Sequence, residues 1–207
     1  MPAIANYVQE IRNIDVENHT THNIRKKNWD WLNFPEKDVL YRAIFTTDEI
    51  NLSRAEVKAE TDIKTKIMKV LMWGYKKTNG SLRPQYFDSI VNHLSVLESI
   101  FGGIQNKNLN TAEITDFFTR MRNVNGLGQS TYSKLLYFFN VSFEDKKCLI
   151  LDKFVIGNLE NFDDFAGTEW KPVPECYLNY LNRMDELARE NNVSPEQLEL
   201  FLFGYQA

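Results

Sequence analysis

Two amphipathic helices joined by a glycine-containing turn constrain this chain more than any other feature. On each side of the turn, apolar residues recur at i, i+3, i+4 and i+7, the spacing of one helical face: Ile114, Phe117, Phe118 and Met121, then Tyr132, Leu135, Leu136 and Phe139. Between them lie Gly126 and Gly128, and glycine permits a positive φ and close approach of another backbone. Such a turn can direct backbone N–H groups outward at the start of the second helix, which predicts an anion site, with phosphate the usual anion.

Length and composition describe an ordinary globular chain. Its 207 residues, 43% hydrophobic and 25% charged, suffice for one large domain or two small lobes. No apolar run is long enough to span a bilayer, and the N-terminus lacks an apolar signal core. We therefore expect an intracellular, cytoplasmic protein with no membrane partner.

Cysteine and histidine usage argues against a resident cofactor. Cys148 and Cys176 are too few for a disulfide scaffold, a four-cysteine zinc site or an iron–sulfur cluster. The three histidines are scattered and lack the spacing of metal ligands. We expect no cofactor and no metal site of this kind.

The charge distribution leaves room for a nucleic-acid partner despite a net charge of −4. Residues 64–83 carry six basic side chains and no acidic one, and residues 126–140 carry Lys134 and no acidic one. A mildly acidic chain with basic strips can still bind a phosphate backbone.

The periodicity predicts an all-α fold of eight to ten short helices, without strand-period alternation. Capping signals mark several helix starts: Ser53 with Glu56, Asn110 with Glu113, and Ser194 with Gln197. The expected helices are 24–32, 35–45, 54–60, 61–75, one long helix from Pro84 to Phe101, the two beside the turn, 153–159, 175–191 and 198–205.

The turn Val124-Asn125-Gly126-Leu127-Gly128-Gln129-Ser130 resembles the hairpin of the helix–hairpin–helix DNA glycosylases, whose usual form is Leu-Pro-Gly-Val-Gly-x-Lys. Asp152, within LILDKFVIGNL, takes the place of the aspartate that follows the hairpin in that superfamily. The chain is most similar to the 8-oxoguanine DNA glycosylase (OGG)-fold branch. This resemblance implies a two-lobed all-α fold, with residues 1–60 and 160–207 in one lobe and residues 61–159 in the hairpin lobe.

The resemblance gives Asp152 the catalytic role. A carboxylate beside the sugar stabilises the positive charge that develops when an N-glycosidic bond breaks, and it orients the attacking water. The alternative is that Asp152 only caps the helix of residues 153–159. An aspartate can do both.

The bifunctional members carry a lysine just after the hairpin glycines, where this chain has Ser130. That lysine forms a Schiff base with the sugar and leads to strand nicking. The departure favours a monofunctional enzyme, unless another amine substitutes. Lys134 is the candidate amine, one helical turn after Ser130 on the same face. Its simpler interpretation, which the sequence favours, is a solvent-facing contact to phosphate.

Further contacts are carried over from the resemblance. The predicted DNA-binding residues are Asn125, Gly126, Leu127, Gly128, Gln129 and Ser130 in the hairpin, Lys76, Lys77, Asn79 and Arg83 in a polar loop, and Lys153. In relatives the hairpin carbonyls also hold a monovalent metal ion. The predicted base pocket consists of Trp73, Glu199 and Phe203. The alternatives are an ordinary helix–helix turn, a solvated basic loop and core aromatic residues.

These features predict a monomeric DNA glycosylase that flips a modified base, an oxidised purine, out of double-stranded DNA and excises it. One alternative is a glycosylase that acts on modified bases of foreign DNA, such as phage DNA. A second alternative, from another class, is a non-catalytic helix–hairpin–helix DNA-binding module.

Overall fold

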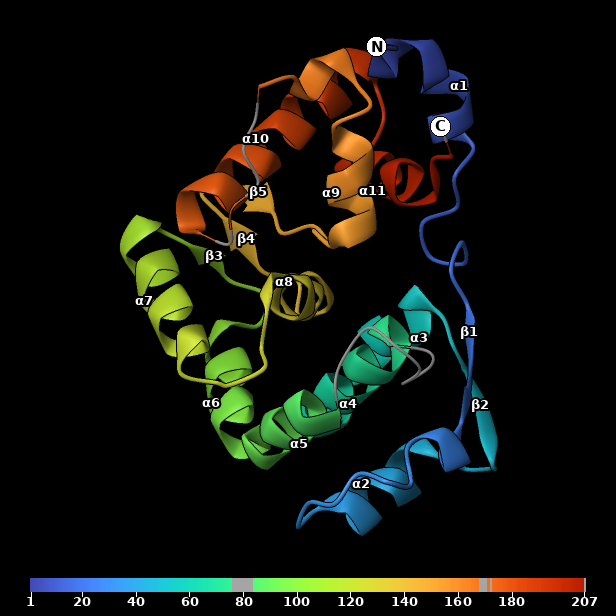
Figure 1. Cartoon of the computed structure of the whole chain (residues 1–207), viewed down its shortest axis with the longest axis vertical. Helices are drawn as coiled ribbons and strands as arrows, with labels where there is room; N and C mark the ends of the chain where they lie inside the picture. Colours follow the sequence, from blue (N-terminus) through green and yellow to red (C-terminus); the bar gives the residue numbers. More distant parts are fainter. Residues whose placement is uncertain (76–83, 168–170, 172, 207) are drawn as a thin grey trace.

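The computed structural model describes residues 1–75, 84–167, 171 and 173–206, and within them helices predominate (Figure 1). The α-helices are α1 (Val8–Arg12), α2 (Lys37–Ile44), α3 (Arg54–Ala59), α4 (Ile63–Gly74), α5 (Pro84–Asn92), α6 (Leu94–Ile104), α7 (Thr111–Arg122), α8 (Gln129–Phe138), α9 (Lys153–Leu159), α10 (Pro174–Asn191) and α11 (Pro195–Gly204). Short 3-10 helices span Ile4–Tyr7, Lys26–Asn28 and Asp163–Phe165.

Local capping chemistry fixes several helix starts as predicted. Ser53, Asn110 and Ser194 each form a complete capping box, in which the cap side chain and the residue three positions later bond each other's backbone N–H. The middle of α11, from Leu198 to Leu202, is buried, as its nearly continuous apolar sequence predicts.

The predicted predominance of helices is confirmed, but the prediction that the fold has no strands was wrong, because the described residues include two small sheets. One pairs β1 (His22–Arg25) with β2 (Glu49–Leu52) in antiparallel register. The other has the order β3 (Asn108–Leu109), β4 (Ser142–Phe143) and β5 (Lys146–Lys147). These strands have two to four residues each, too short for an alternating pattern to be recognisable.

Two predicted helices also differ. The segment predicted as a helix over residues 24–32 is instead strand β1 followed by a 3-10 turn, because pairing with β2 overrides the local pattern. The single helix predicted from Pro84 to Phe101 is broken at His93 into α5 and α6. There the Asn92 side chain donates to the Asp88 carbonyl, and the His93 ring lies 2.7 Å from the Ser89 carbonyl, so side chains compete for helix acceptors.

The helix α8 lies centrally, and every residue from Thr131 to Phe139 is buried (Figure 1). The α4 helix packs against α8 and also against α2, α3 and α6. On the other side, α11 packs against α9, α10 and α1, which brings the first and last helices of the chain together. The segment that ends at Asp152 therefore runs between α8 and the group of α9, α10 and α11. No helix in the described residues has the length and apolarity needed to cross a membrane.

Candidate active site

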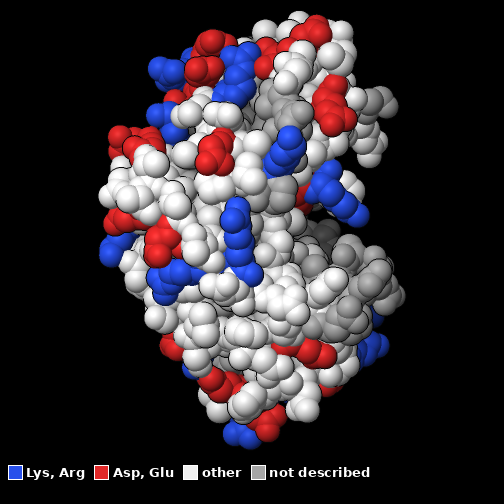
Figure 2. All heavy atoms as spheres, turned by 60° about the vertical axis from the view of Figure 1, so that its left-hand side comes forward, with Lys and Arg blue, Asp and Glu red and all other residues white. Residues whose placement is uncertain are grey.

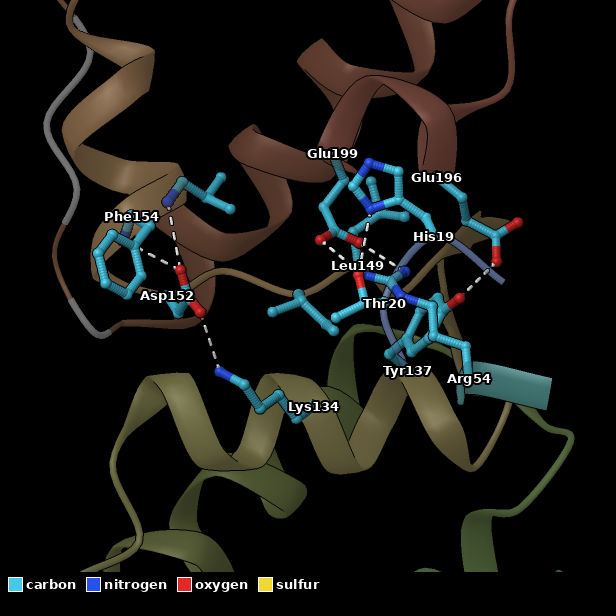
Figure 3. Close-up of polar contacts among 12 residues, drawn as sticks. His19, Thr20, Arg54, Lys134, Tyr137, Leu149, Asp152, Phe154, Glu196 and Glu199 are labelled. Carbon is cyan, nitrogen blue, oxygen red and sulfur yellow. Dashed lines mark hydrogen bonds and ion pairs between the residues drawn. The ribbon is translucent and has the colours of Figure 1, made fainter. Parts of the chain in front are cut away.

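Asp152 is both the N-cap of α9 and part of a buried ion pair. Its Oδ1 accepts hydrogen bonds from the backbone N–H groups of Phe154 (3.0 Å) and Val155 (3.2 Å). Its Oδ2 accepts one from Lys134 Nζ at 3.2 Å (Figure 3). The predicted capping geometry is thus observed, and it uses only one oxygen of the carboxylate. The second oxygen remains available for chemistry beside the amine.

The segment before Asp152 is held from both sides by hydroxyl groups. Ser133 Oγ on α8 accepts from the Leu151 N–H at 3.1 Å. On α10, the hydroxyls of Tyr177 and Tyr180 donate to the carbonyls of Leu149 (2.6 Å) and Ile150 (3.0 Å). Because all these groups are buried, the hydrogen bonds fix where Asp152 is presented.

Lys134 is buried, so its predicted solvent-facing position was wrong. Its Nζ donates to Ser130 Oγ at 2.9 Å and to the Ser130 carbonyl at 3.2 Å, in addition to Asp152. Its stem lies against the end of α4, where a Cβ on Gly74 would approach the Lys134 Cδ to 2.9 Å. The α4 helix covers this face of α8, and the glycine leaves the space that the lysine occupies. Burial lowers the pKa of Lys134, against the opposing attraction of Asp152.

These two side chains lie at a cavity of about 340 Å³, a size suited to a small organic group. All five predicted residues of the catalytic pair and base pocket line it: Trp73, Lys134, Asp152, Glu199 and Phe203. Residues that the sequence did not indicate complete the lining: Thr20, His22, Arg54, Gly74, Tyr75, Ile150 and Phe154.

The two aromatic residues predicted for the pocket differ in how closely their side chains are packed. Trp73 is only 5% exposed, and its ring contacts those of His22 and Phe138 while its Nε1 donates to the Thr20 carbonyl at 3.3 Å. It is therefore a fixed wall. Phe203 is half-buried and meets the ring of Phe154 edge-on at 5.7 Å between centroids.

Glu199 is fully buried and forms a two-pronged ion pair with Arg54. The two terminal nitrogens of the guanidinium donate to the two carboxylate oxygens at 3.1 and 3.2 Å. Tyr137 and Trp73 lie at 4.7 and 5.4 Å from the guanidinium carbon, measured to the ring centroids. Burial raises the pKa of Glu199 and Arg54 opposes it; the two charge-assisted bonds indicate an ionised pair. The cavity is thus lined by two ion pairs, Lys134 with Asp152 and Arg54 with Glu199.

Tyr75 is a further polar group of the cavity. Its hydroxyl lies 2.5 Å from the side-chain oxygen of Thr131 on α8, the residue that follows Ser130. Burial raises the pKa of Tyr75, so its hydroxyl keeps its proton at neutral pH.

The glycine turn between α7 and α8 has the predicted close approach, made by this chain's own backbone. Gly126 has φ +87°, and a Cβ there would meet the Tyr86 Cβ and carbonyl oxygen at 2.9 Å. Gly128 has ordinary φ and open space around it. The N–H groups of Leu127 and Gly128 bond to carbonyls within the turn. Among the described residues, the N–H groups of Gln129 and Ser130, which begin α8, make no backbone hydrogen bond.

The remaining predicted DNA contacts are placed less fully. Asn125 and Lys153 are exposed, Ser130 and Gln129 are half-buried, and Leu127 is buried as an anchor of the turn. Lys76, Lys77, Asn79 and Arg83 lie outside the described residues. In the described part of the chain, no group of three or more His, Cys, Asp or Glu side chains is placed to hold a metal ion.

Sequence reasoning missed the residues that approach the site from distant parts of the chain. Arg54 is 145 positions from Glu199, and Gly74 is on a different helix from Lys134. Neither relation leaves a local pattern. Phe154 had a usable signal, since it follows the predicted catalytic aspartate by two positions.

The site combines a carboxylate–amine pair with a cavity lined by aromatic rings, and it lies beside two helices joined by a glycine turn. Such a site is suited to an enzyme that breaks a bond in a planar organic substrate. Comparison with protein families makes this specific. Residues 14–203 match the model of the family described as "Putative 8-oxoguanine DNA glycosylase OGG-like protein", so the chain belongs to this OGG-like family. No curated protein and no solved structure matches the chain.

Proposed function

We propose that this protein is a DNA glycosylase that accepts one modified base, an oxidised purine, into the cavity and hydrolyses its N-glycosidic bond. The observation that carries the proposal is the position of Asp152 Oδ2 at the cavity wall, where it takes no part in capping α9 and accepts a hydrogen bond from Lys134. Family membership over residues 14–203 supports the same activity.

The chemistry follows from what the cavity offers. Positive charge develops on the deoxyribose as the glycosidic bond breaks, and a fixed carboxylate in a water-poor site stabilises that charge strongly. Asp152 does not reorganise during this step, because two backbone N–H groups fix its orientation. The same oxygen orients the water that attacks the sugar carbon. The base leaves with the electrons of the broken bond and is then protonated.

Lys134 favours a second activity at this site, strand nicking. A buried amine with a lowered pKa is a better nucleophile than an exposed one, and Lys134 is 3.2 Å from the proposed catalytic carboxylate. In this reaction the neutral amine attacks the C1′ carbon and displaces the base. The C1′–O4′ bond of the sugar ring then opens to give a Schiff base, and loss of the C2′ proton expels the 3′ phosphate. Lys134, one helical turn later, then takes the role of the lysine that the bifunctional relatives carry at the position of Ser130.

Duplex DNA is the proposed partner, bound by a single copy of the chain. The N–H groups of Gln129 and Ser130, at the positive end of α8, suit a phosphate of the backbone. A Cβ at Gly128 would meet no atom within 4 Å, so the turn leaves room for a DNA backbone. On the face shown in Figure 2, Lys and Arg side chains lie at the upper edge of a hollow, which supports an electrostatic contact despite the net charge of −4.

Base release from defined substrates tests the proposal. Purified protein is incubated with duplexes that each carry one modified base, and with modified phage DNA, and abasic sites are scored by hot alkali. Alkali-dependent cleavage at one base establishes the glycosylase and names its substrate. Release only from phage DNA favours the defence role. Salt-sensitive DNA binding without release from any substrate overturns the proposal in favour of a non-catalytic binding module.

The same reactions with borohydride decide between the two outcomes for the sugar. A covalent protein–DNA adduct that disappears in Lys134→Ala establishes the lyase step. Base release without an adduct establishes the monofunctional enzyme that the sequence favours.

A further inference from the structure

Phe154 is an apolar side chain that is largely exposed to solvent. Its exposed fraction is 53%, whereas twelve of the other thirteen phenylalanines are buried and Phe203 is half-buried. Single exposed apolar residues are common on proteins, so exposure alone carries no conclusion. What distinguishes Phe154 is its position at the edge of the cavity, two residues after Asp152 (Figure 3).

The backbone of Phe154 is coupled directly to the proposed catalytic group. Its N–H donates to Asp152 Oδ1 at 3.0 Å, so the ring projects from a fixed point beside the carboxylate. The ring of Phe203 meets it edge-on at 5.7 Å and 78°, and both rings line the cavity. This contact supports Phe154 from one side and leaves much of its ring in solvent.

A cation accompanies the ring. Lys153 Nζ lies 4.9 Å from the centre of the Phe154 ring, and the Lys153 side chain is exposed. An exposed aromatic ring next to an exposed ammonium group matches the two parts of a nucleotide, because bases stack on aromatic rings and phosphates attract cations. A purely apolar partner would gain nothing from Lys153, and a purely anionic partner would gain nothing from the ring.

We propose that Phe154 is a substrate-positioning residue, which packs against the extruded nucleotide and places its N-glycosidic bond over Asp152, while Lys153 binds the adjacent phosphate. This inference rests on the proposed function. It assigns to the start of α9 the role of orienting the nucleotide, in addition to the walls formed by Trp73 and Phe203. The hydrogen bond between Asp152 and the Phe154 backbone N–H fixes the two residues relative to each other. A nucleotide that packs on the Phe154 ring therefore has its sugar beside the carboxylate.

Leucine substitutions at two exposed aromatic positions test the inference. Phe154→Leu removes the stacking surface and keeps an apolar side chain, and Phe154→Tyr keeps the ring. Trp31→Leu is the matched control, because Trp31 is also exposed (37%) and lies in a different part of the chain, outside the cavity lining. Three quantities are measured for each variant: kcat and KM for base release, binding to duplex that carries a baseless tetrahydrofuran site, and base extrusion reported by 2-aminopurine fluorescence.

For Phe154→Leu we expect kcat/KM to fall by about 5- to 150-fold, the range that corresponds to about 1–3 kcal/mol of base–aromatic stacking. Extrusion should fall in parallel, binding to the baseless duplex should change by less than about threefold, and the melting temperature should stay near that of the wild type. Phe154→Tyr should restore most of the activity, and Trp31→Leu should resemble the wild type. Lys153→Ala should instead weaken binding to the substrate duplex and to the baseless duplex, and it should reduce the salt dependence of binding.

The outcomes separate this inference from the proposed function. If the wild type releases base and Phe154→Leu keeps its kcat/KM and extrusion within twofold, the inference is wrong and the glycosylase stands. If Phe154→Leu loses binding to the baseless duplex equally, the ring has only a general DNA contact and the inference is also wrong. If the wild type extrudes a base without releasing it and Phe154→Leu abolishes extrusion, Phe154 has the proposed role and the proposed chemistry is wrong.

Discussion

The buried pair of Arg54 and Glu199 predicts an asymmetric response to substitution. Both side chains are 1% exposed, and the two hydrogen bonds between them measure 3.1 and 3.2 Å. Removing one partner of a buried ion pair leaves an uncompensated charge, which costs about 3–5 kcal/mol. A domain with about 5–15 kcal/mol of total stability loses much of it in this way.

The two single substitutions differ because only one of the remaining partners can become neutral. In Glu199→Met, Arg54 keeps its charge at any accessible pH, so we expect the full cost of about 3–5 kcal/mol. In Arg54→Met, Glu199 can bind a proton. Protonating a carboxyl of ordinary pKa 4.5 costs about 3 kcal/mol at pH 7 and under about 1 kcal/mol at pH 5.

The sign of the pH dependence follows from linkage. Burial without Arg54 raises the pKa of Glu199 above its value in the unfolded chain, so the native state binds more protons than the unfolded state. The stability of Arg54→Met must then fall as pH rises above 4.5 towards the raised native pKa, and recover on acidification. Glu199→Met must lack this component.

Urea unfolding at pH 5 and pH 7 measures these effects. The double variant Arg54→Met with Glu199→Met should lie within about 2 kcal/mol of the wild type, because apolar replacement of a whole buried pair is often neutral and the lost contacts with Tyr137 and Trp73 are modest. Glu49→Gln is the control, since its pair with Arg25 is about half exposed and is worth at most about 1 kcal/mol. Single variants no less stable than Glu49→Gln would refute the reasoning, as would identical pH profiles for the two.

Other predictions follow from local geometry. In urea unfolding, Gly126→Ala should cost about 1–3 kcal/mol because of its φ of +87° and its contact with Tyr86, whereas Gly128→Ala should cost less, because its φ is ordinary and a Cβ there meets no atom. Asn110→Ala should cost about 1 kcal/mol in urea unfolding through loss of the α7 cap, a result that an unchanged midpoint would contradict. If the lyase operates, borohydride trapping should rise with pH and level off below 10.5, because burial lowers the pKa of Lys134; a plateau only above 10.5 would argue against this amine.

The features that the sequence predicted well are those determined within a few residues. The three capping boxes and the Asp152 cap depend on side chains that bond backbone groups two or three positions away, and the glycine turn depends on the positive φ of Gly126. Hydrophobic periodicity then located most of the helices, because each needs only one apolar face. The sheet of β1 and β2 was missed because its strands are four residues long and separated by more than twenty positions.

The structure brings the residues proposed for the catalytic pair and the base pocket together around one cavity, but the sequence did not predict their burial or their ion pairs. Resemblance indicated Asp152, Glu199 and the two aromatic walls, but nothing local distinguishes a buried lysine from an exposed one on α8. Lys134 is buried because Gly74 on α4 leaves space for its stem. Glu199 is tolerated in the core because Arg54, 145 positions away, neutralises it. Both depend on tertiary packing between segments that share no sequence pattern.

The most direct test of the account is the rate of base release by Asp152→Asn under single-turnover conditions. Asparagine caps a helix about as well as aspartate, so the start of α9 should keep its structure and the variant should bind duplex DNA nearly as the wild type does. It removes the negative charge at Oδ2. The account predicts a loss of at least about 100-fold in the rate of base release, comparable to the loss of one electrostatic stabiliser of a transition state. A variant that releases base within a few-fold of the wild-type rate would show that Asp152 is only a helix cap, and the proposed chemistry would be wrong.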